Sequence, residues 1–115
     1  MARPINVTRQ TITIPNGTAI TPEIDIGADS LFGIAATGTW AAAALTFQMS
    51  PDGINWYEIQ GPTSVLTYNI AAGQFVAIDP SLWNGINAFK VRSGTVGTPV
   101  NQGAGCTLLI VSGQP

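Results

Sequence analysis

Histidine is absent from this 115-residue sequence, and lysine occurs only once. Without histidine the chain lacks the commonest general base, the usual catalytic triads and most zinc ligand sets. The one lysine, Lys90, and Arg92 alternate with Phe89 and Val91, so we expect both cations on an exposed strand face and the apolar pair on the other face. Serine–lysine catalysis then has no supporting residues.

The few acidic residues do not form a recognisable catalytic or calcium motif. Glu23, Asp25 and Asp29 are close in sequence, but carboxylates on a short exposed strand are usually only solvated. Calcium prefers several oxygen ligands in one loop, and the loops near Asp29 and Asp52 each offer too few. We therefore expect no catalytic residues, no metal and no cofactor, and we do not expect an enzyme.

Charge of either sign is scarce. Four basic and six acidic residues give a net charge of −2, and only 9% of residues are charged, where about 25% is typical. So few cations argue against a nucleic-acid partner, because neutralising phosphates requires a basic patch. Two interpretations stay open: a small β-domain with a hydroxyl-rich surface, or a domain whose surface is covered by neighbours in an assembly.

Long apolar runs are also missing. No stretch of about 18 apolar residues is present, so we expect no transmembrane helix and no membrane partner. The start, M-A-R-P-I-N, lacks the apolar core of a secretory signal, which favours synthesis in a cytoplasm. The single cysteine, Cys106, lies in the apolar run C-T-L-L-I-V, and we expect a buried structural thiol rather than a nucleophile.

Alternation of apolar and polar residues is the clearest feature that is present. Leu45, Phe47 and Met49 alternate with polar residues, which places three apolar side chains on one face of a strand. The following P-D-G is a strong turn signal, and a second strand-like run comes after it. We predict a β-hairpin over residues 44–59 with an Asp-Gly tip and with Trp56 in the core.

Similar strand and turn signals recur along the chain, about every eight to twelve residues. A single helical turn is expected where Asp79 can cap Pro80, and 94–105 is expected to be a long loop. The pattern predicts an all-β, single-domain antiparallel β-sandwich or jelly roll of about eight strands, spanning 1–115. Besides the hairpin we expect strands at 9–14, 20–26, 31–37 (central in its sheet), 65–70, 74–78, 87–93 and 106–111, and a tail at 112–115. Residues 1–8 are interpreted as an N-terminal arm, with a short edge strand as the alternative for 3–8.

The aromatic residues allow two interpretations. Trp40, Trp56, Tyr57 and Trp83 could stack on sugars, as in carbohydrate-binding modules, or fill the core. Trp56 and Tyr57 are adjacent in a strand, so they point to opposite faces and only one of them can be exposed. We assign Trp56 and Trp83 to the core and leave Trp40 open.

The hairpin also resembles a pattern that recurs in small structural proteins of tailed bacteriophages, L-x-F-Q-x-S-x-D-G-x-x-W-x-x-L. This chain has L-T-F-Q-M-S-P-D-G-I-N-W-Y-E at 45–58, then Ile78-Asp79-Pro80, V-R-S-G-T at 91–95 and P-V-N-Q at 99–102. The resemblance covers residues from about 40 to 112, and the N-terminal third has no match. It implies a virion component, a capsid cement or decoration protein, and it supplies no catalytic residues.

The resemblance implies the major capsid protein and copies of the chain itself as partners, with a homo-oligomer on the capsid surface after synthesis in the host cytoplasm. Exposed strand edges and the N-terminal arm could add strands to a neighbour's sheet. The alternative function is a carbohydrate- or receptor-binding module of a phage head fibre or tail, with Trp40 or Tyr57 in a shallow groove. The residues that we expect on the contact surface are Arg3, Ile5, Trp40, Asp52, Tyr57, Thr95 and Pro99.

Overall fold

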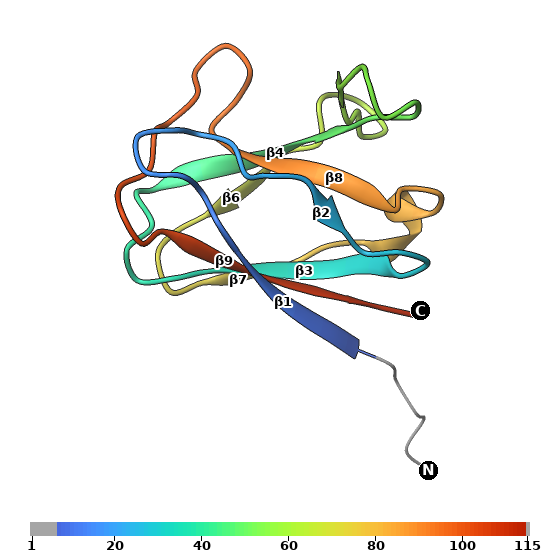
Figure 1. Ribbon diagram of the computed structural model, residues 1–115, viewed down its shortest axis with the longest axis horizontal. Coiled ribbons are helices and arrows are strands. Elements are labelled where there is room, and N and C mark those ends of the chain that lie inside the picture. Colours follow the sequence, from blue (N-terminus) through green and yellow to red (C-terminus); the bar gives the residue numbers. More distant parts are fainter. Residues whose placement is uncertain (1–6, 115) are drawn as a thin grey trace.

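The computed structural model describes residues 7–114, and this part of the chain is almost entirely β (Figure 1). Within it, the one helical element is a short 3-10 turn, η1 (Pro80–Trp83). The strands are β1 (Val7–Thr13), β2 (Ile24–Asp25), β3 (Ser30–Ala36), β4 (Ala43–Met49), β5 (Tyr57–Glu58), β6 (Tyr68–Ile70), β7 (Phe75–Ala77), β8 (Ala88–Ser93) and β9 (Thr107–Gly113).

These strands form two antiparallel sheets that lie face to face as two layers. The first sheet has the order β1-β9-β3-β7. The second has the order β2-β8-β4, and both β5 and β6 pair with the remaining edge of β4. Figure 1 shows β3 and β9 in the lower layer and β4 and β8 in the upper one. The predicted single-domain β-sandwich is confirmed.

The strand pairing is that of a jelly roll. The first half of the chain pairs with the second half in reverse order: β1 with β9, β2 with β8, β3 with β7, and β4 with β5 and β6. Rolling this long hairpin places β9 beside β3 and β8 beside β4. The strand position after β4 is divided between β5 and β6, so nine strand segments occupy eight positions.

The facing sides of the two sheets supply the core. Side chains alternate along each strand, so β4 turns Leu45 and Phe47 inward while β9 turns Leu108 and Ile110 inward, and all four are fully buried. Strand β3 lies between β9 and β7, as its apolar sequence predicted.

Aromatic rings fill the centre of this core. The Phe47 ring meets the rings of Trp83, Phe89 and Tyr68 edge-on, with centroid distances of 5.2, 6.4 and 6.0 Å. Edge-to-face pairs at these distances add to the stabilisation that comes from burial alone. Phe47 therefore packs at the meeting point of strands β4, β6 and β8 with the turn η1.

The turn η1 delivers Trp83 to that cluster. The Asp79 carboxylate accepts a hydrogen bond from the Ser81 amide at 3.0 Å, and Pro80 opens the turn with a suitable φ. Trp83 is 1% exposed. The predicted helical turn and the predicted core position of Trp83 are both confirmed.

Several predicted boundaries are wrong. Strand β1 pairs with β9 along its whole length, from Val7 opposite Gly113 to Thr13 opposite Thr107. Residues 7–8 therefore belong to an edge strand, the alternative to an arm, and residues 112–113 belong to β9 rather than a tail. The rest of the predicted arm lies outside the described residues. Only residues 24–25 and 68–70 are strand in the segments 20–26 and 65–70.

The predicted hairpin exists, but its connection is longer than a tight turn. Met49 pairs with Tyr57, so residues 50–56 form a seven-residue loop. Gly53 has φ +77°, as the turn signal predicted, but the chain continues through exposed residues before it returns. Trp56 is only half-buried, and the Lys90 ammonium lies 4.2 Å from its ring centroid. Its predicted core position is wrong, because the ring lies against Lys90, which belongs to the outer side of β8.

Candidate functional site

The outer side of the first sheet is apolar across three of its four strands. Strand alternation and register place Leu109 and Val111 of β9 opposite Ala35 and Gly33 of β3. On the other side of β3, Phe75 and Ala77 of β7 lie opposite the same two residues. We name this surface the outer apolar face, formed by Gly33, Ala35, Phe75, Ala77, Leu109 and Val111.

Few polar groups interrupt this surface. Phe75 is 54% exposed, and Leu109 and Val111 are half-buried. The outward residues of the neighbouring β1 include Arg9 and Thr11, and Arg9 is the only charge among the outward positions of the four described strands. An antiparallel sheet with one face in water usually carries polar residues there. A broad apolar surface of this kind is typical of a protein contact site.

Gly33 leaves room for the Phe75 ring on the outer apolar face. The Phe75 ring lies directly over this glycine, and a Cβ built on Gly33 would be 2.1 Å from the ring and 2.7 Å from the Val76 carbonyl oxygen. Any side chain at position 33 would therefore displace both the ring and the neighbouring backbone. The glycine allows Phe75 to lie across the sheet, where the ring covers backbone and still presents apolar area.

The loop at 50–56 is a second exposed feature, and it is ordered by Asp52. The Asp52 Oδ1 atom accepts the amide hydrogens of Ile54 and Asn55, both at 2.8 Å, and Ser50 Oγ donates to it at 3.1 Å. The Asn55 and Ile54 amides hold the pKa of Asp52 well below its ordinary value of 3.8. The loop thus holds Ile54, 79% exposed, in a fixed position on the surface.

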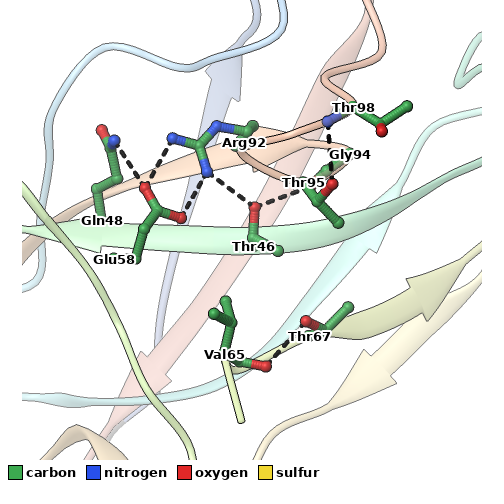
Figure 2. A network of polar contacts seen from close by, with 9 residues as sticks. All are labelled: Thr46, Gln48, Glu58, Val65, Thr67, Arg92, Gly94, Thr95 and Thr98. Atoms are coloured by element: carbon green, nitrogen blue, oxygen red, sulfur yellow. Dashed lines mark hydrogen bonds and ion pairs between the residues drawn. The ribbon is translucent and has the colours of Figure 1, made fainter.

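A polar network joins the bases of the loops (Figure 2). Arg92 Nη2 donates to Glu58 Oε2 at 2.8 Å, and Arg92 Nη1 donates to Thr46 Oγ1 at 3.3 Å. Gln48 Nε2 also donates to Glu58 Oε2, and Thr46 Oγ1 donates to the Gly94 carbonyl oxygen at 2.8 Å. The network therefore ties β5, which follows the loop at 50–56, to the start of the loop at 94–105.

Arg92 was expected on an exposed face, and this expectation is wrong. Its exposed fraction is 8%, because its side chain lies against Glu58 and Thr46 on the outer side of the second sheet. The Arg92 guanidinium, through its hydrogen bonds, holds the pKa of Glu58 below its ordinary value of 4.5. Arg92 Nη1 also donates to Glu58 Oε1, and this bidentate pair fixes the position of β5 more firmly than a single contact would.

The loop at 94–105 begins with a compact turn. Gly94 and Pro99 form an isolated bridge, and the backbones of Thr95 and Thr98 exchange hydrogen bonds at 3.2 Å. Val96 at the tip is 65% exposed. The predicted loop is confirmed, and its first six residues form an ordered projection.

The predicted contact residues do not gather at one place. Figure 1 shows the loop that follows β4 and the loop that follows β8 projecting from opposite ends of the upper layer. Asp52 and Tyr57, exposed, belong to the first end, and Thr95 and Pro99 belong to the second. Arg3 and Ile5 lie outside the described residues.

Trp40 is buried, and its predicted place on the contact surface is wrong. Its exposed fraction is 4%, and it belongs to the hydrophobic core cluster although it lies in a loop. The loop backbone is held there by Gln102, whose side chain bonds both the amide and the carbonyl of Ala41, at 2.8 and 3.0 Å. With Trp83 also buried, these two tryptophans cannot form an exposed sugar-stacking platform.

The outer apolar face has one signal in the sequence, in strand β9. In the run C-T-L-L-I-V, Leu109 and Val111 alternate with the core residues Leu108 and Ile110, so both faces of β9 are apolar. The same feature in β3 predicts a central position within its sheet, and this does not distinguish a covered outer side from an exposed one. Phe75 had no such signal, because its place over Gly33 depends on the pairing of β7 with β3.

Other chemistry has little support in residues 7–114. These residues contain no group of three or more His, Cys, Asp or Glu side chains close enough to hold a metal ion. No helix among them is long and apolar enough to cross a membrane. Cys106 is buried as predicted, its thiol donates to Gln102 Oε1 at 3.4 Å, and burial raises its pKa.

The described residues include shallow depressions of ≈ 260 Å³ beside Trp83 and Asn84 and of ≈ 220 Å³ within the loop 61–67. Neither is lined by a set of residues that points to a particular ligand. No protein-family model and no curated protein matches this sequence. The outer apolar face and the two projecting loops are therefore the features on which a functional assignment depends.

Proposed function

We propose that this protein is a virion structural protein that binds the outside of a tailed-phage capsid as a cement or decoration protein. The observation that carries the proposal is the outer apolar face, which leaves Phe75, Leu109 and Val111 uncovered on a sheet with one outward charge. Water is a poor environment for such a surface, and covering it with another protein is favourable. The order of the motifs between residues 45 and 102 supports the same assignment.

The geometry suits a static contact. The face is built on three hydrogen-bonded strands, so it loses little conformational entropy when it docks. Specific protein contacts usually bury about 1,200–2,000 Å² in total. A capsid repeats its surface by symmetry, so one contact of this size is formed many times. Binding across the boundary between neighbouring capsid subunits would then hold these subunits together.

The carbohydrate- or receptor-binding alternative has less support. It relied on an exposed aromatic pair, and Trp40 is buried. Tyr57 is 55% exposed, and beside it Trp56 is partly covered by Lys90. One exposed tyrosine next to a cation–π pair offers a small stacking surface rather than a platform.

The test is a binding and stability assay on purified heads that lack the protein. The wild-type chain should bind them and raise the temperature at which they release DNA. The variant Phe75→Lys introduces a charge on the outer apolar face at an exposed position, and we expect at least about tenfold weaker binding. Asn69→Lys adds the same charge on exposed Asn69 of β6, on the outer side of the second sheet, and should bind like the wild type.

The possible results distinguish the outer apolar face, the decoration function and the carbohydrate-binding alternative. Equal binding by both variants would show that the outer apolar face does not carry the contact. No binding by the wild-type chain, with unchanged head stability, would reject the decoration function. Binding on a glycan array that Tyr57→Ala abolishes would favour the alternative.

A further inference from the structure

The edges of the two sheets are unequal in length. At three edge positions the strands are short: β7 has three residues, β2 has two, and β5 and β6 have two and three. The fourth edge is β1, with seven residues. Short edge strands are a common protection against pairing with other chains. By this measure β1 is the least protected edge of the described fold.

Nothing else in β1 protects it. Its sequence, V-T-R-Q-T-I-T, contains no proline and a single charge, Arg9, and its register with β9 has no bulge. Among residues 7–114, no segment pairs with its outer edge. Prolines, bulges and several charges are the usual devices that prevent strand addition.

The hydrogen-bond pattern identifies which backbone groups face that edge. The Ile14 amide donates to the Cys106 carbonyl, and the Thr37 amide donates to the Thr107 carbonyl on the other side of β9. Hydrogen-bonded pairs alternate along an antiparallel ladder, so the groups of residues 8, 10 and 12 point to β9. The N–H and C=O groups of Val7, Arg9, Thr11 and Thr13 therefore point away from β9, toward the open edge of the sheet. We call these the outward backbone groups of β1.

We propose that β1 pairs antiparallel with β1 of a second copy, about a two-fold axis at Gln10. Val7 then lies opposite Thr13 of the second copy, and Arg9 lies opposite Thr11 of the second copy. In this register every outward backbone group of β1 pairs with an outward backbone group of the second copy. Arg9, the only charge in β1, lies opposite the Thr11 hydroxyl of the second copy rather than opposite the second Arg9. Shifting the axis to Arg9 would bring two like charges together, which is unfavourable.

The pairing joins the two first sheets into one sheet and makes the two outer apolar faces continuous. It does not require a capsid, so it stands apart from the proposed function. The contact is isologous, with the same strand on both sides, which is the commonest arrangement of homodimers. Backbone hydrogen bonds supply the affinity, and the Arg9–Thr11 contacts set the register.

Sedimentation velocity of the full chain over a dilution series tests the pairing. Thr11→Pro removes one outward N–H that β9 does not use, so the fold should remain while the dimer weakens at least about tenfold. Thr11→Lys places a cation opposite Arg9 of the second copy, twice by symmetry, and should also weaken the dimer. Thr11→Glu should tighten the dimer by about three- to tenfold, with a gain that salt removes.

Circular dichroism and thermal unfolding establish that each variant is folded, and the Lys and Glu variants decide the matter if Thr11→Pro does not fold. Monomeric wild-type protein at every concentration would overturn the proposal. If Thr11→Lys and Thr11→Glu change the dissociation constant of the dimer equally, the proposed register and the contact through the β1 edge are both wrong. If the protein is a monomer and still binds heads, the pairing of β1 is rejected and the proposed function is not. The two proposals therefore fail separately.

Discussion

Arg92 connects three strands of the second sheet through one side chain. It extends from β8 and donates to Thr46 on β4 and to Glu58 on β5. Removing it leaves a half-buried carboxylate and a buried hydroxyl without their charged donor. Removing one partner of such a pair costs more stability than replacing both partners with apolar residues, because the remaining group keeps its desolvation penalty.

We expect Arg92→Met to lower the free energy of unfolding by about 1–3 kcal/mol, since Glu58 retains partial access to water. Urea denaturation measures the change. Lys90→Met is the matched control, because Lys90 is on the same strand and its ammonium lies over the Trp56 ring in a cation–π interaction; we expect a loss under about 1 kcal/mol. Equal losses in the two variants would contradict the structural role of the Arg92 network.

Glu58 also makes stability depend on pH. Its pKa is held below 4.5 in the folded chain by Arg92. The unfolded chain therefore binds more protons near that pH, so the contribution is complete above pH 4.5 and is lost as the pH falls through the folded pKa. We expect a flat urea midpoint between about pH 7 and pH 5, then a decline. Glu58→Gln should show a shallower decline, and coincident profiles would argue against this origin.

The burial of Arg92 shows where prediction from sequence stops at this scale. Alternation correctly placed Phe89 and Val91 on the inner side of β8 and Arg92 on the outer side. What covers Arg92 is Glu58, 34 positions away in the sequence. No local pattern indicates that contact, because it arises from β5 and β8 pairing with opposite edges of β4.

At the scale of elements, the loop at 50–56 is ordered by a single carboxylate. Asp52 accepts two backbone amides and the side-chain amide of Asn55, at 2.9 Å for the last. We expect Asp52→Ala to speed hydrogen exchange at Ile54 and Asn55 by about an order of magnitude. The thermal midpoint should change little, because the loop is exposed.

Nuclear magnetic resonance measures this exchange, and Ser81 serves as an internal control, because Asp79 rather than Asp52 accepts its amide hydrogen. Unchanged exchange at Ile54 and Asn55 in the Asp52→Ala variant would mean that the loop is ordered by something else. Faster exchange throughout the chain would indicate general destabilisation rather than release of this loop.

Strand positions were predictable and strand lengths were not. The alternating stretches became β1, β4 and β8, and the apolar run at 106–111 became most of β9, because each has a long partner in the sheets. The stretch at 65–70 kept only three strand residues, since β6 shares the edge of β4 with β5. The seven-residue loop was missed for a similar reason: its P-D-G turn is real, but the pairing of Met49 with Tyr57 sets the loop length.

At the scale of the whole molecule, the jelly roll gives the chain two different outer surfaces. The second sheet turns a polar network and two projecting loops outward, and the first sheet turns the outer apolar face outward. The class of fold followed from the spacing of turns in the sequence. The spacing of turns did not indicate which outer surface is apolar, because that depends on the order in which β7, β3, β9 and β1 pair.

The most direct test of the decoration function is an image of heads saturated with the protein, at a resolution that fixes the orientation of the domain. Our proposal predicts the β1-β9-β3-β7 sheet against the capsid, with Phe75 and Val111 at the contact and the loops at 50–56 and 94–105 pointing away. The opposite orientation, with those loops against the capsid and the outer apolar face in solvent, would contradict it.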